Sequence, residues 1–257
     1  MIGVKDGNFH PTSQPREEFL KTLMRAKEKH LPPHMPWIFG PWVQFSNRVA
    51  HLHEDDDSWT TGDSWPTGFV RTRSPADGGI VTGPLTGIAI FNGDCPLVFL
   101  QQNDQLAVLH AGYRCLIRAD QDGKNVIESA IEYFDPKQTH AWIQGGVGPC
   151  CWLPEYDDKP EILEPKRSRR PELLAQCLGR TTQSPAGPGH VSVDLYALAR
   201  GLLLQVGVPE ENISWDTTCT CCAMENGEPP YWSYTRFKSG KQDVDGRNFS
   251  IAWLEQQ

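Results

Sequence analysis

Cys95 and His110 are the residues of this 257-residue chain whose types and spacing most directly indicate chemistry. The cysteine precedes the apolar run 97–100, and the histidine ends the apolar run 106–109. Two short apolar runs separated by a polar break predict two buried strands joined by a turn. If these strands are antiparallel neighbours, the thiol and the imidazole lie at the same end of one sheet. Such a pair is either a nucleophile with its base or two ligands of one metal ion.

Several further elements are expected to position this strand pair. An apolar stripe at helical spacing over 123–134 predicts a helix directly after it. The same argument predicts helices over 16–30 and over 195–206, the latter capped by Asp194. The other expected elements are extended segments over 41–53, 79–82, 87–91 and 140–144, a helical stretch over 171–179, and two strands between Tyr231 and Leu254. Together they predict an α+β fold with mixed β-sheets flanked by helices.

The composition limits the class of protein. A formal net charge of -8 disfavours nucleic acid and anionic membranes as partners, because phosphate binding requires clustered Lys and Arg. No apolar stretch approaches the length of about 20 residues that spans a bilayer. The N-terminus has no apolar signal-peptide core. We therefore expect a soluble cytoplasmic protein built as one domain over 1–257, in which cysteines serve as thiols or metal ligands rather than in a disulfide framework.

A series of short motifs occurs in the same order as in a known family. The motifs are Ala76-Asp77-Gly78-Gly79-Ile80-Val81-Thr82, Gly93-Asp94-Cys95-Pro96-Leu97-Val98, Leu106 to Arg114, Gly148-Pro149-Cys150-Cys151, Cys219-Thr220, Trp232-Ser233-Tyr234-Thr235-Arg236 and Gly246-Arg247. Together they resemble the YfiH-like, or laccase-domain, family, whose members have been called polyphenol oxidases, peptidoglycan editing factors and zinc-dependent purine nucleoside phosphorylases. The resemblance covers residues 76–254, whereas residues 1–53 are shorter than or divergent from the family's N-terminal part. The ordered series is specific, although each motif alone is weak.

The resemblance implies a zinc site. The family's Asp-Cys and His-Ala-Gly motifs supply two ligands, which correspond to Cys95 and His110. A third ligand comes from a Gln-Val-His-Gly motif, and the alignment places Ser46 where that histidine is expected. We therefore predict His51 as the third ligand, with His53 as the alternative, since the two would share one face of a strand. One thiolate, two imidazoles and an open fourth position form a catalytic arrangement.

The resemblance also implies a reaction on purine nucleosides, with a nucleoside and phosphate as the small molecules bound. Zinc lowers the pKa of a bound water to about 7. The resulting hydroxide would attack C6 in adenosine deamination, whereas phosphorolysis would place phosphate at the ribose C1′. Asp94 is expected to orient a ligand or shuttle a proton. Arg114 is expected to bind phosphate through its planar fork of donors, although it could instead pair with a carboxylate.

Other readings fit the same residues. The cell-wall members of the family imply an amidase acting on peptidoglycan precursors. A chain that lacks the third histidine could be a degenerate, non-catalytic relative that binds a metabolite or a partner protein. Copper is the less favoured cofactor, because a multicopper oxidase needs several histidine clusters. Without the family motifs, Cys95 and His110 would most simply be a buried cysteine and a hydrogen-bonded histidine. The sequence leaves the oligomeric state open.

Five more cysteines have a distinctive spacing. They are Cys150, Cys151, Cys219, Cys221 and Cys222. Cys-Cys and Cys-x-Cys-Cys differ from the Cys-x-x-Cys pairs of ordinary zinc ribbons. The spacing therefore favours a packing or redox-sensitive cysteine cluster over a second metal site.

Overall fold

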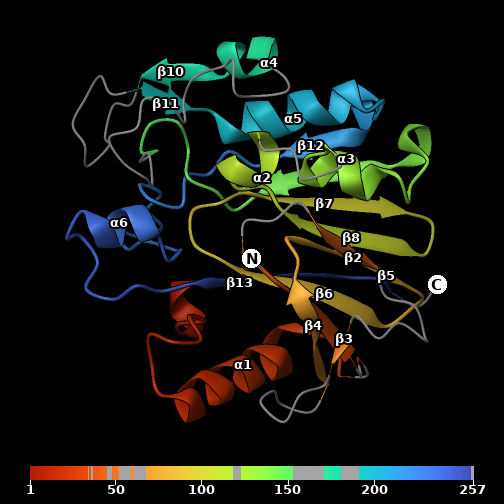
Figure 1. Cartoon of the computed structure of the whole chain (residues 1–257). Coiled ribbons are helices and arrows are strands. Elements are labelled where there is room, and N and C mark those ends of the chain that lie inside the picture. The colour runs from red at the N-terminus through yellow and green to blue at the C-terminus, as the bar shows by residue number, and fades with distance from the viewer. Residues whose placement is uncertain are drawn as a thin grey trace.

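Two mixed β-sheets lie face to face, and helices cover their outer faces (Figure 1). The structure, a computed structural model, describes residues 1–33, 35, 37–44, 48–51, 59–60, 68–117, 123–152, 171–180 and 191–255. The first sheet has the spatial order β13 (Asn248–Trp253), β6 (Thr86–Asn92), β1 (Trp37–Trp42), β4 (Phe69–Pro75) and β3 (Trp59–Thr60). The second has the order β12 (Ile213–Trp215), β9 (His140–Gln144), β7 (Leu97–Gln102), β8 (Gln105–His110), β5 (Gly78–Thr82) and β2 (Val49–His51). The predicted α+β fold with mixed sheets is confirmed.

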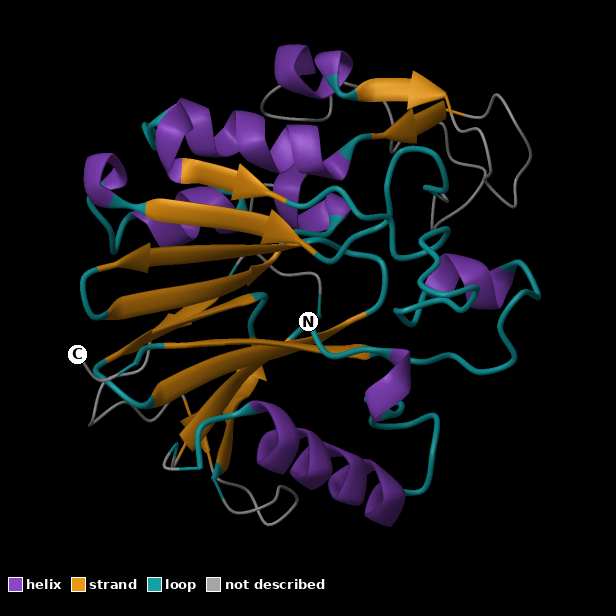
Figure 2. Cartoon of the chain, turned by 180° about the vertical axis from the view of Figure 1, so that it is seen from behind, coloured by secondary structure: helices purple, strands orange, loops and turns teal. Residues whose placement is uncertain are grey.

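The helices lie in two outer layers. The second sheet is covered by α2 (Tyr113–Ile117), α3 (Val126–Ile131) and α5 (Leu195–Gln205), with α4 (Pro171–Gln176) packed on α5. The antiparallel pair β10 (Leu178–Arg180) and β11 (Val191–Val193) lies next to α4. Seen from behind, α1 (Arg16–His30) covers the opposite outer face, and α6 (Tyr234–Lys238) lies at one edge (Figure 2). Short 3-10 helices span Val4–Asp6, Pro136–Gln138 and Glu210–Asn212.

The central strand pair is buried on both faces. Val98 and Leu100 of β7 point into the helical layer, whereas Leu97 and Phe99 point toward the first sheet. A strand enclosed on both sides carries a continuous apolar run rather than an alternating one, which explains the sequence pattern. The antiparallel register places Leu97 opposite His110 and Gln102 opposite Gln105. The predicted strand–turn–strand unit is therefore confirmed.

Local capping explains where the predicted helices begin. The side chain of Asn125 accepts hydrogen bonds from the backbone amides of Ile127 and Glu128, and the Glu128 carboxylate accepts one from the Asn125 amide. This capping box starts α3 within the predicted range. Asp194 accepts a hydrogen bond from the Ala197 amide at the start of α5, as expected from the sequence.

The segment after Tyr231 does not form the first of the two strands predicted there. Residues Tyr234–Lys238 form α6 instead, and only β13 is a strand. Ser233 caps this helix by accepting a hydrogen bond of 3.1 Å from the Arg236 amide. The Ser233 cap therefore decides the local structure in favour of a helix.

Candidate functional site

The side chains of Cys95 and His110 converge beside Gly112. A Cβ atom at Gly112 would lie 3.0 Å from the Sγ atom of Cys95 and 3.3 Å from the Nε2 atom of His110. Both atoms therefore border the same small space, which the absence of a side chain at Gly112 leaves open. His110 is buried and Cys95 is half-buried, so the thiol faces the more accessible side. The predicted meeting of the two groups at one end of the strand pair is what the structure shows.

Asp77 fixes the orientation of His110. Its Oδ1 atom lies 2.7 Å from the Nδ1 atom of His110, and its backbone carbonyl accepts a hydrogen bond of 2.7 Å from the His110 amide. Asp77 precedes β5, which pairs with β8, so the sheet itself brings these residues together. With Nδ1 bound to the carboxylate, the Nε2 atom is left to face Cys95. This is the arrangement in which a carboxylate orients a metal-binding or catalytic imidazole.

The charges around His110 change its protonation. Burial alone disfavours the protonated ring, but Cys95, the hydrogen bond to Asp77 and the neighbouring Cys115 together raise the pKa of His110 well above its ordinary value. A cation bound between the two groups would take the place of the Nε2 proton.

Asp77, His110 and Cys115 each offer a ligand atom, and these atoms lie within 4.8 Å of one another. Burial, the largest influence, raises the pKa of the Cys115 thiol to about 11. The Sγ atom of Cys115 lies 3.5 Å from Asp77 Oδ1 and 3.6 Å from His110 Nδ1, so it faces the ring nitrogen that the carboxylate already contacts. The 2.7 Å separation of Asp77 from His110 is also that of a hydrogen bond. We therefore place the open coordination side at Nε2 and assign Asp77 to a supporting position.

His51 does not lie with Cys95 and His110, contrary to the prediction. Its ring is stacked on Tyr133, and its Nε2 atom is 3.4 Å from the side-chain nitrogen of Gln105. Gln105 begins β8 and His110 ends it, so the two positions are about 16 Å apart at about 3.3 Å per residue. The third-ligand assignment to His51 is therefore wrong for this structure. Ser46 and His53, the other positions considered, lie outside the described residues.

Asp94 is held by hydrogen bonds on both of its carboxylate oxygens. Oδ1 accepts one of 2.7 Å from the Thr220 hydroxyl, and Oδ2 accepts one of 2.6 Å from the Thr235 amide. Its backbone carbonyl accepts another from the Val147 amide. Asp94 thus connects the segment before Cys95 to two distant loops. Asp94 therefore positions the segment before Cys95, and its expected role in orienting a ligand or shuttling a proton stays a prediction.

Two arginines lie near the same end of the sheet. Arg114 is half-buried in the first turn of α2, close in sequence to His110. The side chain of Arg247 approaches Gly93, where a Cβ atom would lie 3.7 Å from its terminal nitrogen. The guanidinium of Arg247 is paired with Asp245 and lies 5.8 Å from the centre of the Tyr234 ring. The ion pair of Arg247 and Asp245 therefore lies beside the segment that carries Cys95.

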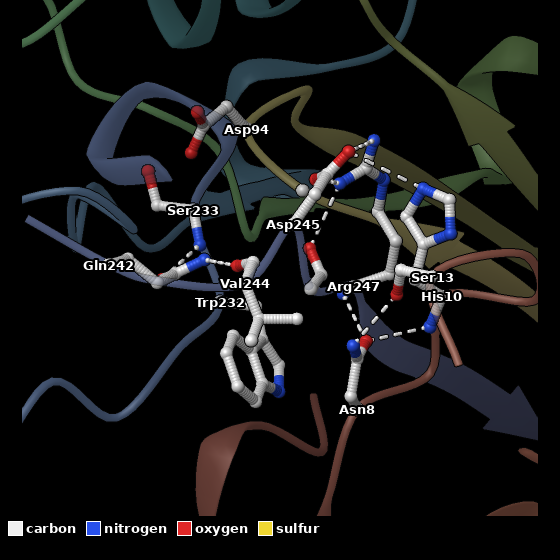
Figure 3. Close-up of polar contacts among 12 residues, drawn as sticks. Asn8, His10, Ser13, Asp94, Trp232, Ser233, Gln242, Val244, Asp245 and Arg247 are labelled. Atoms are coloured by element: carbon white, nitrogen blue, oxygen red, sulfur yellow. Dashed lines mark hydrogen bonds and ion pairs between the residues drawn. The ribbon is translucent and has the colours of Figure 1, made fainter. Parts of the chain in front are cut away.

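A polar network joins the N-terminal segment to the loop that carries Arg247 (Figure 3). The side-chain oxygen of Asn8 accepts hydrogen bonds from the amides of His10 and Arg247. His10 in turn lies 3.5 Å from the Asp245 carboxylate. Residues from the two ends of the chain thus set the position of Arg247.

Sequence reasoning overlooked Asp77 and Arg247 as residues of the site. Both belong to the motifs already recognised, so their presence in an ordered family block was a usable signal. Their roles depend on the pairing of β5 with β8 and on the return of the chain terminus to Gly93. Neither contact can be derived from local spacing.

Comparison with known proteins identifies the family. The family described as multi-copper polyphenol oxidoreductase laccase matches residues 38–255 of this chain. The chain belongs to this family. The crystal structure of the Bacillus licheniformis hypothetical protein YfiH superimposes with a TM-score of 0.70 at 17% identity, over 96% of this chain and 85% of that one. YlmD from Geobacillus stearothermophilus gives a TM-score of 0.67 at 20% identity, over 97% of this chain and 85% of that one. These similarities establish the laccase-domain fold.

Two relatives carry a functional name. A protein named purine nucleoside phosphorylase from Xylella fastidiosa strain Temecula1 is 29% identical over 198 residues, which make up 75% of this chain and 66% of that protein. Its counterpart from strain 9a5c is 30% identical over 190 residues, 72% of this chain and 64% of that protein. The matched segment thus spans slightly less than two thirds of either relative.

Among the described helices of this laccase-domain protein, none is long and apolar enough to cross a membrane.

Proposed function

We propose that this protein is a zinc-dependent purine nucleoside phosphorylase. The single observation that carries the proposal is the convergence of Cys95 Sγ and His110 Nε2 beside Gly112, with Asp77 bound to the other ring nitrogen. The names of the two Xylella relatives support the choice of substrate class. Phosphorolysis joins a phosphate oxygen to the ribose C1′ while the C1′–N9 bond breaks. The bond's electron pair goes to the purine, which takes up a proton.

The donor set fits a thiolate- and imidazole-binding metal. Cys95 and His110 would hold the ion, and they are the two ligands that we propose among the described residues. A third ligand would come from another part of the chain. Zinc acts as a Lewis acid and activates a bound oxygen when such a site is filled. The described histidines other than His110 make their contacts elsewhere, with Asp245 for His10, Asp6 for His30, Gln105 for His51 and Trp142 for His140. That dispersal disfavours the several clustered histidines of a multicopper centre, so we propose zinc rather than copper.

The protein's own groups divide the remaining work. Asp77 keeps a proton on Nδ1 of His110, so that the Nε2 lone pair faces the site. Arg114 would bind the phosphate dianion through its planar donor fork, and Arg247 would have to exchange its contacts with Asp245 to do so. Asp94 holds the segment before Cys95 in place through Thr220 and Thr235.

The test is a phosphate-dependent assay with the metal-replete protein. Adenosine or inosine with phosphate should yield the free purine base and ribose 1-phosphate, and omission of phosphate should abolish this yield. Cys95→Ala should lower the rate by at least about 100-fold. Cys177→Ala is the matched control, since Cys177 packs in the helical layer and its loss should preserve most of the rate. Absence of base release from zinc-replete wild-type protein overturns the proposal.

The same incubation separates the other candidate reactions. Conversion of adenosine to inosine with release of ammonia and no need for phosphate would indicate deamination. Release of an amino acid or peptide from a peptidoglycan precursor would indicate an amidase. The placement of His51 away from Cys95 favours one non-enzymatic alternative, a relative that binds purines without metal. Metal-free protein that binds adenosine without turnover would support that alternative.

A further inference from the structure

Four cysteines outside the catalytic pair form a compact cluster. The sulfur atoms of Cys150, Cys151, Cys219 and Cys222 all lie within 4.8 Å of one another. The Sγ atoms of Cys150 and Cys222 are 3.7 Å apart. Zinc–sulfur bonds of about 2.3 Å in a tetrahedron place neighbouring sulfurs about 3.8 Å apart. The observed spacing therefore matches the edge of a tetrathiolate site.

We propose that Cys150, Cys151, Cys219 and Cys222 bind a second, structural zinc ion. Four thiolates fill the coordination sphere and leave no open position for substrate. Soft thiolates in a tetrahedron favour zinc among the common divalent ions. An iron–sulfur cluster would need its thiolates spread around several irons, whereas these sulfurs surround the space of one ion.

The backbone around the cluster is shaped for sulfur ligands. Cys150 and Cys151 lie in a turn in which the amides of Cys151 and Trp152 donate to the Gly148 carbonyl. The other two lie in a turn closed by a hydrogen bond from the Ala223 amide to the Cys219 carbonyl. Backbone amides of Gly148, Cys221 and Cys222 also donate to the sulfur of Cys219. Amide donors of this kind stabilise a thiolate at Cys219.

Close packing at Gly148 and the burial of two of the cysteines confine the four-sulfur cluster. A Cβ atom at Gly148 would lie 3.3 Å from the Sγ atom of Cys150, so a larger residue would push into the cluster. Cys151 and Cys219 are buried, whereas Cys150 and Cys222 are half-buried. The buried pair thus packs on the helical layer.

The cluster is connected to the catalytic pair. Arg236, which is buried, donates hydrogen bonds to the carbonyls of Thr220 and Cys221 within the second turn. Thr220 donates from its hydroxyl to Asp94, the residue before Cys95. A zinc ion that joins the two turns therefore also fixes Asp94.

The spacing of these cysteines in the sequence favoured a packing or redox-sensitive cluster over a second metal site. Cys-Cys and Cys-x-Cys-Cys differ from ordinary zinc-binding pairs because here each turn contributes adjacent or nearly adjacent residues. The tetrahedron is completed by bringing together turns about 70 residues apart, which a local rule does not consider. The thiol of Cys221, the fifth cysteine, contacts that of Cys151 but does not belong to the group of four sulfurs that all lie within 4.8 Å of one another.

Metal analysis of cysteine variants tests the proposal independently of catalysis. All variants carry Cys95→Ala, so that the proposed catalytic ion makes no contribution. This background should retain about one zinc per chain, and the further change Cys177→Ser, the matched control at a cysteine outside the cluster, should leave that content unchanged. Cys222→Ser should weaken zinc binding by more than about tenfold. Loss of zinc with Cys177→Ser and retention with Cys222→Ser would overturn the ligand assignment.

Two measurements need no further substitution in the cluster and so do not depend on a variant that folds. Cobalt(II) in the Cys95→Ala protein should give the intense bands of tetrahedral cobalt together with thiolate-to-cobalt charge transfer. Titration of the zinc form with a mercurial reagent should release the ion as four thiols react. Absence of a bound ion, or a disulfide between any two of the four cysteines in freshly purified protein, would overturn the proposal. Stoichiometric copper(I) in place of zinc would overturn the choice of metal.

Discussion

The carboxylate of Asp77 contacts Nδ1 of His110 at 2.7 Å, from the end of the neighbouring strand. The contact selects the tautomer of the imidazole and directs Nε2 to the space shared with Cys95. Asp77 is fully buried, so water does not weaken the interaction. The chemistry of the site therefore depends on the register between β5 and β8 as much as on the two reactive side chains.

Replacing Asp77 by Asn tests this dependence. Asn keeps the size of the side chain and can still accept a hydrogen bond, but it removes the negative charge that makes His110 a better ligand. We expect zinc affinity at the catalytic site and kcat each to fall by about 10- to 100-fold. Metal titration and steady-state kinetics measure the two effects. The control is Asp104→Asn in the exposed turn after β7, and equal behaviour of the two variants would refute the role of Asp77.

The placement of His51 makes a second prediction. Because its ring lies against Tyr133 and Gln105, His51→Ala should leave the zinc content of the catalytic site unchanged. His53→Ala is the paired variant, and it should lower that content if His53 supplies the missing ligand. Metal content in chains that also carry Cys222→Ser isolates the catalytic ion. Zinc loss with His51→Ala would mean that β2 adopts another position when the ion is bound.

The open space beside Gly112 gives a third prediction. An alanine Cβ there would lie 3.0 Å from Cys95 Sγ, which forces the thiol away from His110. A displacement of about 1 Å in a catalytic group can cost about 100-fold in rate, and we expect a loss of that size. Gly179→Ala is the matched control, because its Cβ would meet its nearest neighbour at an ordinary 3.5 Å. Equal rates for the two variants would show that the space beside Gly112 is not used.

The sequence predicts the centre of this fold better than its edges. The runs 97–100 and 106–109 are apolar because their strands are covered on both faces, and this pattern predicts two buried strands. The prediction of a strand around Tyr234 was wrong. Trp232, Ser233 and Tyr234 alternate between aromatic and polar side chains as a short strand does, but the deciding contact is the Ser233 cap. Short segments carry too little periodicity to outweigh one hydrogen bond.

The sites also contain contacts that the sequence predicts and contacts that it does not. Cys95 and His110 are adjacent through a hairpin, so the sequence alone predicts that they meet. Asp77, Arg247 and the cluster around Cys219 come together through contacts between residues far apart in the chain. Their positions follow from sheet register and from loops anchored by buried hydrogen bonds, which local patterns do not encode.

His10 links the stability of the network in Figure 3 to pH. Burial, followed by the nearby charge of Arg247, lowers the pKa of His10 below its ordinary value of 6.5. Its Nδ1 atom also accepts a hydrogen bond of 3.2 Å from the Thr12 amide, which requires the neutral ring. The unfolded chain therefore binds this proton more readily than the folded protein does. The stability contributed by neutral His10 is fully present above about pH 6.5 and is lost as the pH falls through the lower folded-state pKa.

His10→Gln should accordingly reduce the dependence of the free energy of unfolding on pH in that acidic window. Glutamine can still accept from Thr12 and donate to Asp245, but it does not titrate. Urea unfolding at pH values from about 5 to 8 measures the slope. A parallel series with His140→Gln, which removes an exposed ring from β9, controls for the loss of any histidine. A slope in His10→Gln as steep as in the wild type would place the acid-sensitive contact elsewhere in the protein.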